Sequence, residues 1–149
     1  MKKVLVTGAS GFIGSYIVSE GLDKGYDMWA GMRGTSSKGY LQDNRIKFAQ
    51  LNLGDKDKLK QQLEALKCEM GGAWDYVVHA AGATKCLKIE DFYRTNTQGT
   101  INLIEALQET DMVPERFVFV SSLSVFGAIR ETPVKTPAQG YGKGAEISE

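Results

Sequence analysis

The chain has 149 residues, of which 42% are hydrophobic and 24% are charged. Its 18 basic side chains balance 18 acidic ones, so the formal net charge is zero. A chain of this length is about the size of one domain and can bury a core without disulfides or metal ions. Because the charge balance provides no positive field for phosphate groups, we expect neither a nucleic-acid nor a membrane partner.

The first apolar run, residues 4–6, is too short for a signal peptide, and no segment is long enough to span a bilayer. A cytoplasmic location is therefore the simplest expectation. Cys68 and Cys86 stand far apart, and His79 is the only other soft ligand. We therefore expect neither a zinc site nor a disulfide framework.

Short apolar runs rich in β-branched residues alternate with longer segments of helical periodicity. This order is typical of a parallel sheet covered by helices on both faces. We therefore predict an α/β fold, a doubly wound parallel sheet with helices on both sides. The predicted strands are residues 3–7, 26–32, 46–50, 74–78 and 116–120.

Three helices are predicted between these strands. The first follows a glycine-rich turn and ends at Gly25, the second is capped by Asp55 and stops at residues 71–72, and the third covers 89–110. Residues after Phe126 are predicted to form a loop. The apolar positions are Phe12, Ile13, Tyr16, Ile17 and Leu22 in the first helix, Leu59, Leu63 and Leu66 in the second, and Phe92, Tyr93, Leu103, Ile104 and Leu107, expected to be buried, in the third.

The strongest local signal is Thr7-Gly8-Ala9-Ser10-Gly11-Phe12-Ile13-Gly14, which joins a predicted strand to a predicted helix. This is the context that a dinucleotide fingerprint requires. Gly8 allows a tight turn, Gly11 lets a pyrophosphate approach the backbone, and Gly14 lets the helix pack close to the sheet. The pyrophosphate would lie at the helix N-terminus, where free N–H groups favour an anion. A structural turn that binds no ligand is the alternative.

This stretch, with the features that follow, resembles the extended short-chain dehydrogenase/reductase superfamily of the NAD-dependent epimerase/dehydratase type. The resemblance covers residues 3–141 and implies a Rossmann fold. It also implies cofactor contacts from the glycine-rich turn, from the loops after the third and fourth strands, and from a helix asparagine. The implied cofactor-binding residues are Gly8, Ser10, Gly11, Phe12, Ile13, Gly14, Asn52, Leu53, Ala80, Ala81, Gly82, Asn96 and Tyr141.

Asn52 stands where the family has an acid that contacts adenine, and its amide can still hydrogen-bond the edge of the base. His79 precedes the small residues 80–82, which leave room for the cofactor. We expect His79 to be a packed histidine at the end of a strand rather than a catalytic base.

The charge after the second strand bears on the choice of nicotinamide cofactor. An acid at the end of this strand would bind the ribose hydroxyls of NAD and repel a 2′-phosphate, but Met32 stands there and Arg33 follows. The loop also carries Ser36, Ser37 and Lys38, which suit a phosphate together with Arg33. We therefore predict NADP ahead of NAD. The alternative is that Arg33 and Lys38 are solvated loop charges.

Residues 117–127 resemble the fifth strand and the active-site loop of the family. The resemblance selects Ser122, five residues before Gly127, as the hydroxyl that hydrogen-bonds the substrate oxygen, with Ser121 and Ser124 as competing candidates. Tyr141 resembles the tyrosine of the family's Tyr-x-x-x-Lys pair, which exchanges the substrate proton.

The lysine of that pair is missing, because the residue four after Tyr141 is Ala145. In the family this lysine binds the nicotinamide ribose and lowers the pKa of the tyrosine electrostatically. Lys143 would project from a different side of a regular helix, so it can substitute only if the segment is not helical. The interval between Ser122 and Tyr141 is also shorter than is typical of the family.

We expect residues 1–149 to form an NAD(P)-binding Rossmann domain, without the C-terminal substrate domain of the family. The leading hypothesis is the cofactor-binding part of an oxidoreductase, epimerase or dehydratase. Such an enzyme would transfer hydride at a carbonyl or secondary alcohol of a small molecule, such as a nucleotide sugar. The alternative is a non-catalytic dinucleotide-binding or redox-sensing module. Family members often pair through helices like the one predicted at 89–110, so the resemblance is compatible with a homodimer.

Overall fold

A computed structural model describes residues 1–123 of the chain. Residues Met1–Phe119 form one compact unit, and a second unit begins at Val120. The loop predicted after Phe126 lies outside the described residues, as do Ser124, Tyr141, Lys143 and Ala145.

Five parallel strands form one sheet with the order β3-β2-β1-β4-β5. This is the strand order of the Rossmann fold, and it confirms the predicted doubly wound sheet. The winding reverses between β1 and β4, where a crevice opens at the carboxyl ends of the strands. The strands are β1 (Lys3–Thr7), β2 (Asp27–Met32), β3 (Lys47–Gln50), β4 (Tyr76–His79) and β5 (Arg116–Phe119), each beginning and ending within two residues of its predicted bounds.

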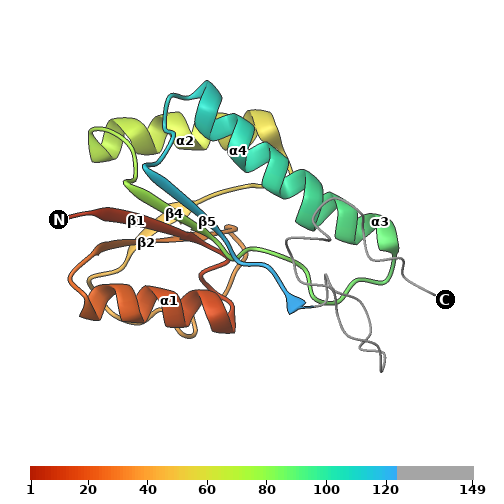
Figure 1. Cartoon of the computed structure of the whole chain (residues 1–149), viewed down its shortest axis with the longest axis horizontal. Helices are drawn as coiled ribbons and strands as arrows, with labels where there is room; N and C mark the ends of the chain where they lie inside the picture. Colours follow the sequence, from red (N-terminus) through yellow and green to blue (C-terminus); the bar gives the residue numbers. More distant parts are fainter. Residues whose placement is uncertain (124–149) are drawn as a thin grey trace, which may run out of the picture. The chain divides into compact units, whose positions relative to one another are not determined.

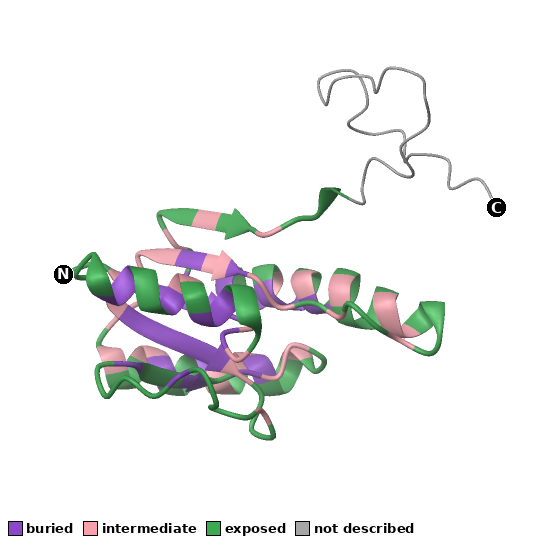
Figure 2. Ribbon diagram, turned by 90° about the horizontal axis from the view of Figure 1, so that it is seen from below, coloured by how far each residue is buried: buried purple, intermediate pink, exposed green. Residues whose placement is uncertain are grey.

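Helix α1 (Phe12–Asp23) covers one face of the sheet, and α2 (Lys56–Met70) and α4 (Gly99–Glu109) cover the other (Figure 1). Strand β1 supplies both cores because its side chains alternate between the faces. Val4 and Val6 belong to the α1 side, and Leu5 belongs to the α2 and α4 side. The buried residues accordingly lie in the middle of the layers, while the outer helix surfaces are exposed (Figure 2).

The prediction for α2 is confirmed in detail. Asp55 caps the helix by accepting a hydrogen bond from the Lys58 N–H, and the helix ends at Gly71 in the left-handed conformation. Its three stripe leucines are all buried, which attaches α2 to the sheet.

The apolar face predicted for α1 is confirmed only in part, since Leu22 is buried and Ile17 is half-buried against the same core. Phe12, Ile13 and Tyr16 are 77%, 56% and 69% exposed, whereas the helix buries Gly14, Ser15, Val18, Gly21 and Leu22. The reason is close approach, since a Cβ on Gly21 would overlap the side chain of Met28 in β2. Small residues therefore form part of the contact with the sheet, together with Val18 and Leu22, while Phe12, Ile13 and Tyr16 remain outside.

The single helix predicted for 89–110 is instead three helical segments. They are α3 (Ile89–Phe92), the π-helical segment η1 (Tyr93–Gln98) and α4. A π-helical turn is wider than an α-helical turn and changes the phase of the side chains. Leu103 and Leu107 are buried as predicted, but Tyr93 and Ile104 are 66% and 40% exposed and Phe92 is only half-buried. Asn102 and Ala106 are buried as well.

Within residues 1–123 no helix combines the length and the apolar character that crossing a membrane requires. The same residues contain no group of three or more His, Cys, Asp or Glu side chains placed to hold a metal ion. Cys68 and Cys86 are free thiols.

Candidate functional site

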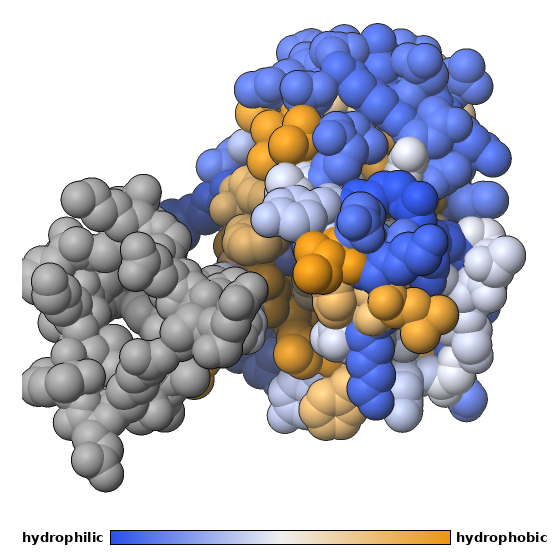
Figure 3. All heavy atoms as spheres, turned by 90° about the vertical axis from the view of Figure 1, so that its right-hand side faces the viewer, coloured by the Kyte–Doolittle hydropathy of each residue, from blue (hydrophilic) through white to orange (hydrophobic). Residues whose placement is uncertain are grey.

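A cleft of about 790 Å³ lies at the carboxyl ends of β1, β2, β3 and β4. Its volume falls in the range of small-molecule sites. Figure 3 faces this edge of the sheet, where apolar and polar side chains are interspersed. The cleft is lined by nine of the predicted cofactor-binding residues, namely Gly8, Ser10, Gly11, Arg33, Asn52, Leu53, Ala80, Ala81 and Gly82.

The glycine-rich turn packs backbone directly against backbone. Gly8 has a φ of +68°, and a Cβ there would lie 2.7 Å from the backbone N and Cα of Ala81. A Cβ on Gly14 would overlap the carbonyl oxygen of Gly8, and one on Gly11 would lie 3.3 Å from the same oxygen. The tight turn predicted at Gly8 is confirmed, and Gly14 is needed for contact with the turn itself.

Helix α1 begins directly at this turn. Gly11 is its N-cap, no side chain caps the helix, and the first turn carries no acid. The first N–H groups of a helix have no intrahelical acceptor and attract anions. The side chains of Phe12 and Ile13 are exposed and do not line the cleft, so only their backbone N–H groups can serve an anion there.

The loop after β3 forms one wall of the cleft with Asn52 and Leu53. The Asn52 N–H donates to Gln62 Oε1 at 2.8 Å, and Asn52 Oδ1 accepts from the Gly54 N–H at 3.2 Å. The loop therefore offers an apolar side chain and an amide next to each other.

The loop after β4 is held from both sides. The Ala80 N–H donates to the carbonyl oxygen of Thr7 at 3.3 Å. Asn96, in η1, accepts from the Ala83 N–H at 2.7 Å and donates to the Ala83 carbonyl at 3.1 Å. Asn96 does not line the cleft, and both polar atoms of its side chain are used to hold this loop.

His79 is buried at the end of β4, which confirms that it is a packed histidine. Its Nδ1 lies 2.6 Å from Thr7 Oγ1, and its Nε2 lies 2.9 Å from Thr100 Oγ1. The Thr100 hydroxyl donates its single proton to the Asn96 carbonyl at 2.6 Å, so Nε2–H must donate to Thr100 and Nδ1 must accept from Thr7. Both ring nitrogens are thus paired. Burial lowers the pKa of His79 to about 4, which keeps the ring neutral at pH 7.

The two cations predicted to suit a phosphate lie in different places. Arg33 lines the cleft together with Ser36, and no hydrogen bond or ion pair engages its guanidinium within the part of the chain that the structure describes. Lys38 does not line the cleft; its Nζ lies 3.9 Å from the ring centre of Phe48. Met32 ends β2 and lines the cleft, so no acid occupies that position.

Several lining residues were missed from the sequence. Lys85, Arg94 and Thr95 also line the cleft, and Arg94 is paired with Asp91 at 2.6 Å. The sheet topology could have indicated this region, because every loop that follows a strand of a doubly wound sheet opens at this edge. The other missed residues are Thr7, Gly31, Leu51, Gly54, Asp55, Ala83, Thr84 and Gly99.

The described structure tests none of the predicted catalytic residues. Ser122 belongs to the unit that begins at Val120. Tyr141 and Lys143 lie outside the described residues. Their roles therefore stay predictions.

A family model described as "NAD dependent epimerase/dehydratase family" matches residues 4–144. UDP-glucose 4-epimerase 2 of Arabidopsis thaliana is 31% identical, and the match covers 89% of this chain and 39% of that protein. The chain thus spans about two fifths of the length of this curated relative.

Solved structures agree with the fold. The UDP-Glc/GlcNAc 4-epimerase of Campylobacter jejuni has a TM-score of 0.71 at 25% identity, covering 91% of this chain and 43% of that one. The UDP-glucose 4-epimerase of Thermus thermophilus, in complex with NAD, has a TM-score of 0.71 at 26% identity with the same coverage. The similarity extends over most of this chain.

Gly14→Ala is expected to lower the free energy of unfolding by about 1–3 kcal/mol, because the new Cβ meets backbone that cannot rotate away. Urea denaturation measures the change. Gly39→Ala is the matched control, since its Cβ would have only Ser37 Oγ nearby, at 3.6 Å, and we expect a change below about 0.5 kcal/mol. Equal effects of the two substitutions would contradict the close packing at Gly14.

His79 should make stability depend on pH between about 4 and 6.5. Its pKa is about 4 when folded and 6.5 as the ordinary value, so the unfolded chain binds more protons in this window. The contribution is present above pH 6.5 and is lost as the pH falls toward 4, on the order of 3 kcal/mol. Urea denaturation across this range should show a steeper fall for the wild type than for His79→Gln. Parallel curves would show that His79 does not titrate differently in the fold.

Proposed function

The chain belongs to the NAD-dependent epimerase/dehydratase family, and from this we propose that its cleft binds the nicotinamide dinucleotide of a hydride-transfer enzyme. The observation that carries the proposal is the glycine-rich turn, where a Cβ on Gly8 or Gly14 would fill space that backbone occupies. The bare N-terminus of α1 meets this turn at the reversal of strand order, where dinucleotides bind in doubly wound sheets. The reaction is hydride transfer at a carbonyl or secondary alcohol of a small molecule, in the class of the nucleotide sugars.

Different residues of the cleft bind different parts of the cofactor. Ser10, Gly11 and the first N–H groups of α1 hold the pyrophosphate, while Asn52 and Leu53 hold the adenine. The small residues 80–82 leave room for the nicotinamide riboside. When bound, the nicotinamide accepts or delivers the hydride.

The catalytic assignments belong to the same proposal. The Ser122 hydroxyl hydrogen-bonds the substrate oxygen, and the Tyr141 hydroxyl exchanges its proton. Lys143 replaces the missing lysine of the family pair if it reaches the tyrosine. We also propose that the protein is cytoplasmic and forms a homodimer through the segment 89–109. The exposed Ile101 and Ile104 on α4 support this pairing.

NADP is the proposed cofactor ahead of NAD. Met32 offers no carboxylate to repel a 2′-phosphate, and Arg33 and Ser36 line the cleft just beyond it. The Arg33 guanidinium can form charge-assisted hydrogen bonds to that phosphate. Lys38 lies against Phe48, so it has at most a secondary part.

Calorimetric titration with NADPH and NADH tests the cofactor assignment. We expect both to bind, and we expect Arg33→Ala to weaken NADPH by about 10-fold or more while NADH is unchanged, since one charged phosphate contact is lost. Lys38→Ala is the control and should change neither affinity by as much. No binding of either cofactor at millimolar concentration would overturn the proposed function. Equal weakening of both by Arg33→Ala would remove only the phosphate role.

A second candidate function is a non-catalytic dinucleotide-binding or redox-sensing module. The observation in its favour is Ala145, which stands where the family has the lysine that lowers the pKa of the tyrosine. A tyrosine of ordinary pKa, about 10, is ionised to only about one part in a thousand at neutral pH, so proton abstraction would be slow.

Ala145→Lys separates the two candidates. The wild-type chain and this variant are incubated with the preferred cofactor and a nucleotide sugar. Both the nicotinamide absorbance and the conversion of the sugar are followed, because an epimerase returns its hydride and leaves no net change in absorbance. An enzyme with a suboptimal site should turn over slowly and accelerate by about 10-fold or more in Ala145→Lys, within the usual range of acid–base effects. Cofactor binding without turnover in either protein would favour the sensing module.

A further inference from the structure

We propose that Asn102 is a positioning residue that sets the adenine specificity of the cleft by fixing the backbone of Leu53. The inference rests on the proposed cofactor site. Asn102 does not line the cleft, so it acts through the loop after β3 and not by contact with the ligand.

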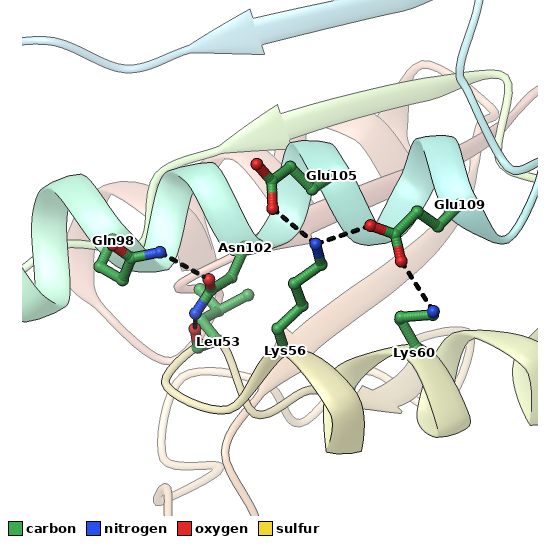
Figure 4. A network of polar contacts seen from close by, with 7 residues as sticks. All are labelled: Leu53, Lys56, Lys60, Gln98, Asn102, Glu105 and Glu109. Atoms are coloured by element: carbon green, nitrogen blue, oxygen red, sulfur yellow. Dashed lines mark hydrogen bonds and ion pairs between the residues drawn. The ribbon is translucent and has the colours of Figure 1, made fainter.

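The geometry at Asn102 is that of a satisfied buried amide. The residue lies on α4 and is only 5% exposed. Its Nδ2 donates to the Leu53 carbonyl at 2.8 Å, and its Oδ1 accepts from Gln98 Nε2 at 2.9 Å (Figure 4). A buried amide left unpaired is costly, so this arrangement strongly favours one orientation of the side chain.

The Leu53 carbonyl needs such a partner because β3 ends at Gln50 and the loop has left the sheet. Gly99, one turn before Asn102, also faces this loop, and a Cβ there would stand in ordinary contact with the Leu53 Cβ, at 3.6 Å. The neighbouring Asn52 N–H is held by Gln62 of α2. The loop is therefore hydrogen-bonded to both α2 and α4.

The two helices are also linked to each other. Lys56 Nζ lies 2.7 Å from Glu105 and 2.6 Å from Glu109, and Lys60 pairs with Glu109 at 2.7 Å (Figure 4). These pairs are partly exposed and contribute little individually. They lie beside the Asn102 contact without touching Leu53, which makes them suitable controls.

The contacts of Asn102 should affect binding of the base and not binding of the phosphates. Leu53 and Asn52 line the cleft together, and Asn52 Oδ1 already accepts one bond from Gly54. A shift of this loop displaces both groups that meet adenine, whereas the pyrophosphate site belongs to the turn between β1 and α1. Loss of the Asn102 contact should therefore reduce discrimination between bases.

The test compares NAD with nicotinamide hypoxanthine dinucleotide, in which an oxygen replaces the 6-amino group of the base. Asn102→Asp keeps the acceptor for Gln98 and the side-chain shape but removes the donor to the Leu53 carbonyl. We expect the wild type to prefer NAD and the variant to lose most of this preference, with NAD weakened by about 10-fold and the analogue weakened less. Glu105→Gln, on the same helix, should leave the ratio of the two dissociation constants unchanged.

Gln98→Leu provides a second variant at an exposed position, in case Asn102→Asp does not fold. It removes the donor that orients the Asn102 amide and should move the same ratio in the same direction by a smaller factor. Equal weakening of both dinucleotides, an unchanged ratio in the folded variants, or a wild type that binds both equally would each overturn the positioning role. Binding of neither dinucleotide by the wild type would instead overturn the proposed function.

Discussion

Backbone packs directly against backbone where β1 passes into α1, and the rest of the site depends on this contact. Gly14 lets the helix approach the carbonyl of Gly8, and Gly8 lets the turn approach Ala81 in the loop after β4. A side chain at either position would separate the elements that close the cleft. The same closeness affects the buried face of α1, where Gly14 and Gly21 lie among the larger Val18 and Leu22.

Buried polar groups provide the second level of organisation. His79 links Thr7 of β1 to Thr100 of α4, and Thr100 in turn donates to the Asn96 carbonyl. Asn96 and Asn102 each use a side-chain amide to hold a loop that has left the sheet. Because each buried polar group needs a partner, these contacts allow few alternative loop positions. The helices over the sheet therefore determine where the cleft walls stand.

The sequence predicted the sheet and the turn well because their signals are local. Short β-branched runs and the glycine spacing need no knowledge of distant residues. The buried face of α1 was predicted only in part, because hydrophobic periodicity gives no weight to glycine. Leu22 is buried, but Phe12 and Tyr16 dominated the pattern although both are exposed. The π-helical segment was missed because hydrophobic periodicity was compared with the α-helical period of 3.6 residues. Lys85 and Arg94 were missed because only the placement of β4 beside β1 brings the loop after β4 and the following segment η1 to the cleft.

The zero net charge excludes long-range attraction of anions, yet it does not exclude a local anion site. Several lysines have carboxylate partners, as Lys56 and Lys60 of α2 do with the acids of α4. Arg33 and Lys85 line the cleft and have no carboxylate partner within residues 1–123. Both side chains therefore add positive charge to the cleft, where the bare N-terminus of α1 also favours an anion. A neutral chain can in this way still attract phosphate to a cleft, where screening by salt is weaker than on the open surface.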